Sequence, residues 1–99
     1  MNSVVRVKIA HFRYDPEKVE IEAGQSIVWE NADTMDHTAT RTAAPPFDTG
    51  TIHSGSQSNA ITFGETTSEQ GIEYSCKPHP FMKGWVIVKA ASANDPKKS

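Results

Sequence analysis

Three side chains that bind soft metal ions stand at equal spacing near the end of the chain: Cys76, His79 and Met82, each separated from the next by two residues. A further histidine, His37, lies upstream, after a predicted strand. Two imidazoles, one thiolate and one thioether are the ligands of a blue-copper electron-transfer site, because sulfur favours Cu(I) and imidazole suits both oxidation states. These four residues predict one mononuclear copper site, with Met82 as its weak axial ligand.

Prolines on both sides of the loop histidine restrict the backbone before any metal binds. Pro78 and Pro80 fix their own φ angles and limit the residues that precede them. Cys76 lies in phase with Ile72 and Tyr74, so its sulfur should point into the apolar interior. A buried thiol is ordinarily unreactive, but a metal ion deprotonates it outright.

The elements that must position these ligands are short strands, because apolar and polar residues alternate along most of the chain. Frequent turn signals separate the alternating runs, and no long helical spacing or internal repeat is visible. This pattern favours an all-β sandwich or barrel. We expect strands around Val5–Ile9, Lys18–Glu22, Ile27–Asn31, Ile61–Phe63, Ile72–Cys76 and Trp85–Lys89, and a long surface connection over Thr40–Ser58.

Length and composition exclude several classes of protein. The 99 residues suffice for one domain, expected over residues 1–91, with 92–99 as a flexible C-terminal tail. A net charge of −2 argues against nucleic-acid binding. The longest apolar run has four residues, too few to cross a membrane, and no signal-peptide run is visible at the N-terminus. The single cysteine excludes an internal disulfide and a binuclear copper centre with two bridging thiolates.

The loop Cys76–Gly84, with the sequence CKPHPFMKG, resembles the copper-binding loop of cupredoxins, the type 1 blue copper proteins, and most of all the amicyanin/plastocyanin group. The resemblance extends over Val5–Ala90 and implies a Greek-key β-sandwich with antiparallel strands. It also implies a periplasmic or otherwise extracytoplasmic monomer that carries single electrons between redox partner proteins. Its upstream part consists of Phe12-x-Tyr14-x-Pro16, Gly24 and Val28-Trp29-x-Asn31, followed by His37.

Two positions depart from this group. Members often have asparagine after the upstream histidine and serine or threonine after the cysteine, and these side chains connect the two ligand loops. Here the positions are Thr38 and Lys77. A threonine can still supply a hydroxyl, but a lysine side chain cannot form the same bond. The hydrogen bonds around the site, which tune a metal centre, should therefore differ in this chain.

Other functions compete less well. A copper-trafficking protein with the same ligands is the main alternative, although such proteins tend to expose clusters of methionine or histidine, and this chain has three Met and four His. An enzyme is not expected, because a buried cysteine in a loop with two prolines is a poor nucleophile. His11 and His53 are interpreted as surface or packing residues.

The exposed end of the site should be where partners dock. His79 is expected to show a ring edge beside Phe81, in an apolar patch suited to brief encounters. A ring of positive charge around the patch is expected from Lys77, Lys83 and Arg41.

Overall fold

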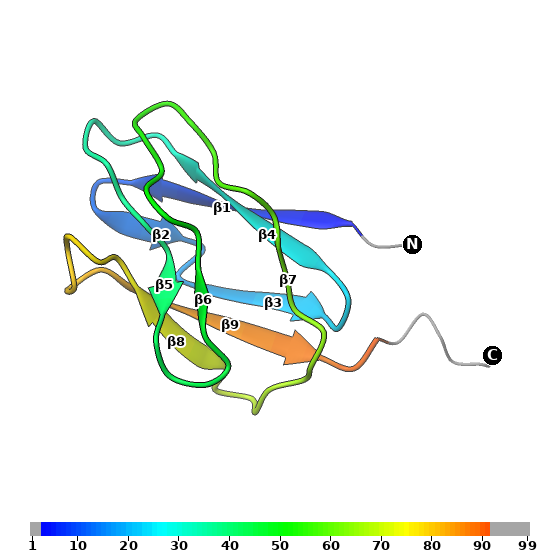
Figure 1. The fold of residues 1–99 in the computed structure, drawn as a ribbon. Coiled ribbons are helices and arrows are strands. Elements are labelled where there is room, and N and C mark those ends of the chain that lie inside the picture. Colours follow the sequence, from blue (N-terminus) through cyan, green and yellow to red (C-terminus); the bar gives the residue numbers. More distant parts are fainter. Residues whose placement is uncertain (1–2, 92–99) are drawn as a thin grey trace.

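The computed structural model describes residues 3–91, which form two β-sheets packed face to face (Figure 1). The tail expected over 92–99 lies outside the described residues. The all-β fold predicted from the alternating sequence and the sandwich implied by the resemblance are both confirmed. The strands are β1 (Val4–Ala10), β2 (Arg13–Asp15), β3 (Lys18–Glu22), β4 (Ser26–Asn31), β5 (Thr40–Arg41), β6 (Phe47–Asp48), β7 (Ile61–Thr62), β8 (Ile72–Ser75) and β9 (Lys83–Lys89).

The chain passes repeatedly from one sheet to the other. One sheet has the order β2-β1-β4-β7 and the other β3-β9-β8-β5-β6. The expectation of antiparallel strands is wrong for two pairs, since β1 runs parallel to β4 and β3 runs parallel to β9. Parallel neighbours need a crossover connection. Here the chain supplies it by visiting the opposite sheet between β1 and β4.

Aromatic side chains fill the space between the sheets. Trp29 is fully buried, and its indole N–H donates to the hydroxyl of Tyr74 at 3.0 Å. The rings of Tyr14 and Tyr74 lie 4.6 Å apart. The hydrogen bond satisfies the indole N–H of a buried ring, and the ring contact adds packing between the two sheets. The core reaches Cys76, which is fully buried.

The segment expected as a surface connection is mostly exposed, but it also contributes short elements to the fold. Thr40–Ser58 contains β5 and β6, and Ile52 within it is 2% exposed. Isolated apolar residues in a polar stretch produce no alternation, so the sequence pattern missed these short elements.

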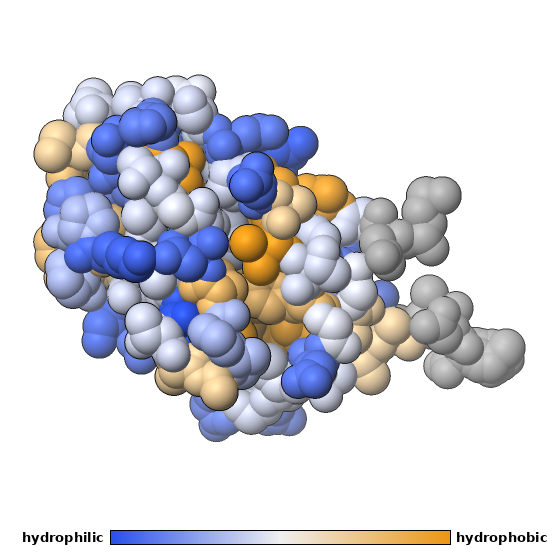
Figure 2. Space-filling model, viewed as in Figure 1, coloured by the Kyte–Doolittle hydropathy of each residue, from blue (hydrophilic) through white to orange (hydrophobic). Residues whose placement is uncertain are grey.

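The two edge strands β6 and β7 do not pair with each other in the described part of the chain. A cavity of about 400 Å³ lies beside them, lined by Phe47, Phe63 and Val88 among others. Figure 2 shows apolar surface in the region between these strands. Val88 is near the end of β9 distant from the cysteine loop, so this cavity is separate from the predicted metal site.

Candidate metal centre

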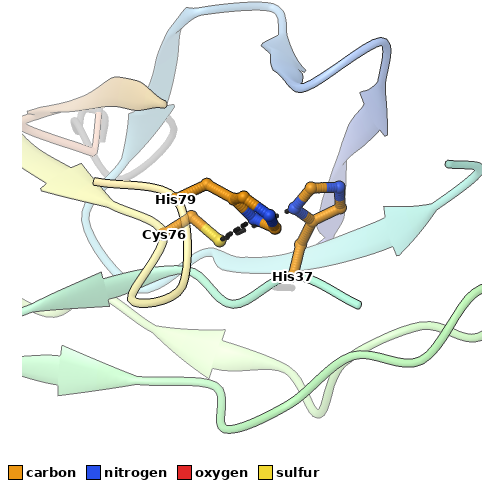
Figure 3. A group of neighbouring side chains, drawn as sticks. All are labelled: His37, Cys76 and His79. Carbon is orange, nitrogen blue, oxygen red and sulfur yellow. Dashed lines mark hydrogen bonds between the residues drawn. The ribbon is translucent and has the colours of Figure 1, made fainter. Parts of the chain in front are cut away.

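Loops at one end of the sandwich bring three of the predicted ligands together (Figure 1). His37 follows β4, Cys76 directly follows β8, and His79 lies in the loop that leads to β9. Their ligand atoms all lie within 4.8 Å of one another. In Figure 3 the two imidazoles and the sulfur point toward a common point.

The spacing of these atoms fits a metal ion. The Nδ1 atoms of His37 and His79 each lie 3.6 Å from the Sγ atom of Cys76. A metal with bonds of about 2.0–2.3 Å to nitrogen and sulfur, as in zinc sites, separates two such donors by about that distance at near-tetrahedral or trigonal angles. A thiolate with two imidazoles is also the in-plane donor set of blue-copper sites. The residues therefore fit copper.

The equal spacing of the ligands in the cysteine loop has a backbone cause. The N–H of His79 donates to the carbonyl of Cys76 at 3.2 Å, and the N–H of Met82 donates to the carbonyl of His79 at 2.9 Å. Each interval of two residues is thus the interior of a tight turn. Pro80 takes the second position of the second turn, where proline is favoured. The N–H of Cys76 closes the loop by donating to the carbonyl of Met82 at 3.2 Å.

His37 is fixed through both its backbone and its ring. Its N–H and carbonyl exchange hydrogen bonds with Ile52, at 3.2 and 2.7 Å. Its Nε2 atom lies 2.9 Å from the Oδ2 atom of Asp33. The Phe12 backbone N–H, followed by the His37 ring and the Thr34 N–H, holds the pKa of Asp33 below its ordinary value. A carboxylate in this position directs the other ring nitrogen, Nδ1, toward the metal.

A threonine connects the two ligand loops in place of the expected pair of side chains. The N–H of Thr38 donates to Sγ of Cys76 at 3.3 Å, and the hydroxyl of Thr38 accepts the backbone N–H of Lys77 at 3.0 Å. The loops are thus joined although the Lys77 side chain takes no part in this bond. Thr38 thus supplies the hydroxyl expected of it, and its partner in the other loop is a backbone N–H.

The same threonine belongs to a closed ring of polar contacts. Its hydroxyl lies 2.9 Å from that of Thr40, which donates to Oδ1 of Asp48 at 3.1 Å. The ammonium of Lys77 returns to Oδ2 of Asp48 at 2.7 Å. The hydrogen bond from Lys77, with that from Gly50, lowers the pKa of the Asp48 carboxyl. We call Thr38, Thr40, Asp48 and Lys77 the threonine clasp.

The outer side of the site is aromatic. The His79 ring is partly exposed, and Phe81 beside it is 70% exposed. Phe12, from the turn between β1 and β2, lies 4.8 Å from the His79 ring and 5.1 Å from the His37 ring, measured between centroids. In the sequence, Phe12 stands out only as part of the family pattern. Nothing in its local sequence marks a residue that reaches both ligands.

Two of the three cations expected to form a positive ring around this patch pair with carboxylates. Lys77 pairs with Asp48 at 2.7 Å, and Lys83 lies 3.4 Å from Glu73. The guanidinium of Arg41 donates to the neutral Glu73 carbonyl at 2.9 Å, a contact that does not offset its charge. The ring thus carries less net positive charge than expected, and its part in docking stays a prediction.

The fourth predicted ligand, Met82, and the two histidines expected outside the site lie where the sequence placed them. Met82 is 2% exposed and ends the cysteine loop, and its axial role stays a prediction. His11 and His53 are exposed and lie outside the ligand cluster, as predicted. No helix in the described part of the chain is long and apolar enough to cross a membrane.

A β-sandwich with a His–Cys–His cluster at one end, two of whose members are buried, defines a small protein that holds a single soft metal ion between its loops. Residues 1–89 match the family described as copper binding proteins of the plastocyanin/azurin type. The chain belongs to this family.

Curated relatives and solved structures agree with this assignment. The chain is 38% identical to amicyanin of Paracoccus versutus, over 86% of this chain and 64% of the relative. It is 30% identical to amicyanin-alpha of Methylorubrum extorquens strain AM1, over 84% of this chain and 70% of the relative. The crystal structure of the Paracoccus versutus protein matches with a TM-score of 0.77 at 32% identity, covering 87% of this chain and 81% of the other.

Family and site together define the activity. The chain is an electron carrier with a copper cofactor, and it is not an enzyme. A copper ion bound by His37, Cys76 and His79 would supply one-electron chemistry through its Cu(II) and Cu(I) states. The protein's part is to hold the donors so that they move little between the two states.

Proposed function

We propose that His37, Cys76, His79 and Met82 together hold one type 1 copper ion, through which this chain, as a monomer, carries electrons between partner proteins. The main support for this proposal is that the donor atoms of His37, Cys76 and His79 all lie within 4.8 Å of one another. The burial of Met82 at the end of the same loop supports its role as the fourth ligand.

The spectrum of the copper-loaded protein tests the ligand set. We expect intense visible absorption and the narrow copper hyperfine splitting of a thiolate-bound type 1 site in the EPR spectrum. Cys76→Ser should abolish the colour while the apo-protein keeps its cooperative thermal transition. His53→Ala is the matched control, because this exposed histidine lies outside the cluster. A colourless Cu(II) complex of the parent protein would contradict the proposal.

The axial role of Met82 needs its own variant. Met82→Leu keeps most of the buried apolar volume, so the fold should persist. Because an axial thioether tunes the potential of a blue-copper site, the variant should bind copper with a changed reduction potential. Met35→Leu, at a methionine that is 48% exposed, should leave the potential unchanged. An unchanged potential in Met82→Leu would remove Met82 from the ligand set.

We further propose that partners dock at the apolar surface around His79 and Phe81, in an extracytoplasmic compartment such as the periplasm. Phe81 presents a large exposed ring beside the partly exposed ligand. Contacts of this kind favour fast release. Phe81→Ser should slow electron transfer to a redox partner while the spectrum stays unchanged. A parental rate in this variant would place docking elsewhere.

A further inference from the structure

The turn between β1 and β2 places two bulky residues in a left-handed conformation. The strands pair as far as Ala10 and Arg13, so that His11 and Phe12 alone form the turn, with φ angles of 54° and 57°. Two-residue hairpin turns with two positive φ angles favour asparagine and glycine. Other residues are strained there, and such strain persists only where the surrounding structure enforces it.

The surroundings that enforce this turn belong to the metal site. The N–H of Phe12 donates to the Oδ2 atom of Asp33 at 2.9 Å. The same oxygen lies 2.9 Å from the Nε2 atom of His37. One carboxylate oxygen thus joins the strained backbone to the ring of a copper ligand.

The side chain of Phe12 makes the second connection. Its ring plane is nearly perpendicular to both imidazoles, at 87° to His37 and 86° to His79. The two imidazole centroids are themselves 4.9 Å apart, so the three rings form a compact triangle. Phe81 stacks on Phe12 with centroids 6.1 Å apart. Neither imidazole can rotate toward the turn without displacing Phe12.

We propose that Phe12 is a positioning residue of the metal centre, which holds the imidazoles of His37 and His79 ready for copper and keeps water from them. The inference rests on the ligand set proposed above. A glycine at position 12 would relieve the backbone strain but would leave both imidazoles without this support. The support of the two imidazoles, and not the geometry of the hairpin, therefore explains why a phenylalanine occupies this strained turn.

Four variants separate this role from general packing. Phe12→Ala removes the ring but keeps the backbone donor, and Phe12→Tyr restores the ring. His11→Gly relieves strain in the same turn without touching the site. Phe81→Ala removes exposed aromatic surface that contacts His79, at 6.0 Å, and not His37 among the described ring pairs. The measurements are copper affinity by competition, reduction potential, and the imidazole NMR signals of the apo-protein.

In Phe12→Ala we expect copper affinity to fall about tenfold, as is typical for residues that support metal ligands. The potential should fall as well, because water near the site favours the more highly charged Cu(II). The apo-protein's His37 and His79 imidazole signals should shift toward those of mobile rings. Phe12→Tyr should restore all three measurements. His11→Gly should leave them at parental values while raising Tm, and Phe81→Ala should leave the His37 signals unchanged.

Parental affinity, potential and apo-protein signals in a folded Phe12→Ala variant would overturn the proposal. If that variant does not fold, Phe12→Leu keeps the apolar volume, and parental values of all three measurements there would overturn it equally. Failure of the ligand set is distinguishable, because a parent protein without blue copper would contradict the proposed function. The apo-protein imidazole signals would still test Phe12 in that case.

Discussion

The two histidines of the copper site are held by different kinds of contact. His37 is fully buried, with its backbone paired to Ile52 and its ring directed by Asp33. His79 is partly exposed, and the ring contacts recorded for it come from Phe12, Phe81 and His37. Hydrogen bonds fix direction, because they weaken steeply when misaligned. Aromatic contacts cover a ring with less directional constraint.

This difference divides the site into two halves. The buried half, around His37 and Cys76, sets the geometry of the donors, and the exposed half, around His79, is where electrons can leave. The buried half contains the thiol and the two threonines of the clasp, Thr38 and Thr40, so we expect the donors there to move little when the oxidation state changes. Copper trafficking requires ligands that exchange readily at the surface, whereas Cys76 and His37 are both 0% exposed. The arrangement therefore favours electron transfer over the trafficking alternative.

The largest expected effect contrasts the two histidines directly. His79→Gly opens a gap at a partly exposed position, so added imidazole should enter it and restore the blue colour. His37→Gly opens a gap that is closed to solvent, and added imidazole should not restore the colour. Titration of each copper-loaded variant with imidazole, followed by absorption, checks this. Equal rescue of both variants would remove the distinction between the halves.

The carboxylate behind the buried histidine gives the next effect. Asp33→Ala leaves the His37 ring without its hydrogen-bond partner, so copper affinity should fall about 10–100-fold. Asp36→Ala is the control, because Asp36 faces the exposed His53 at 3.3 Å. Competition with a copper chelator measures both affinities. Similar losses in the two variants would indicate a general charge effect and not ring orientation.

The threonine clasp should affect stability more than metal binding. Thr38→Val keeps the shape but removes the hydroxyl that accepts the Lys77 N–H. Loss of a hydrogen-bond partner for a partly buried donor costs about 1–3 kcal/mol, whereas the N–H of residue 38 can still donate to Cys76. We expect urea unfolding of the apo-protein to shift by that amount with the blue colour retained. Thr62→Val, at an exposed hydroxyl pair with Ser26, should change stability less.

The sequence predicted Cys76, His79 and Met82 as one group because the chemistry and the spacing of these residues are local, whereas His37 was added for its side-chain type and its place after a predicted strand. Tight turns with two interior residues account for the equal spacing of Cys76, His79 and Met82, and alternation identified the long strands. The partial exposure of His79 was also predicted correctly. The axial role of Met82 stays a prediction.

What the sequence did not predict depends on contacts between distant segments. The roles of Phe12 and Asp33 arise only when the turn after β1 meets the loop after β4. The parallel pairing of β1 with β4 follows from the path of the chain through both sheets. The lysines seemed free to form a basic rim because their partners, Asp48 and Glu73, lie on other strands.

The smallest expected effect concerns the outer edge of the clasp and its dependence on pH. Lys77, Gly50 and Thr40 lower the pKa of Asp48 in the folded protein, so the ionised carboxylate stabilises the fold. That contribution is present above the pKa of the unfolded chain, about 3.9, and is lost as the pH falls through the lower pKa of the folded state. Because the Asp48 side chain is 40% exposed, solvent limits the gain to about 1 kcal/mol or less.

Asp48→Asn should therefore destabilise the apo-protein at about pH 7, and its difference from the parent should shrink below about pH 4. Urea unfolding at both pH values provides the measurement. Glu20→Gln is the control, because Glu20 pairs with Lys89 at 3.0 Å on the surface, away from the clasp. Asp48 also accepts a hydrogen bond from the hydroxyl of Thr40, which in turn contacts the hydroxyl of Thr38. The loss of stability at about pH 7 should therefore be larger for Asp48→Asn than for Glu20→Gln. A difference for Asp48→Asn that is the same at both pH values would mean that the clasp acts through packing and not through the charge of Asp48.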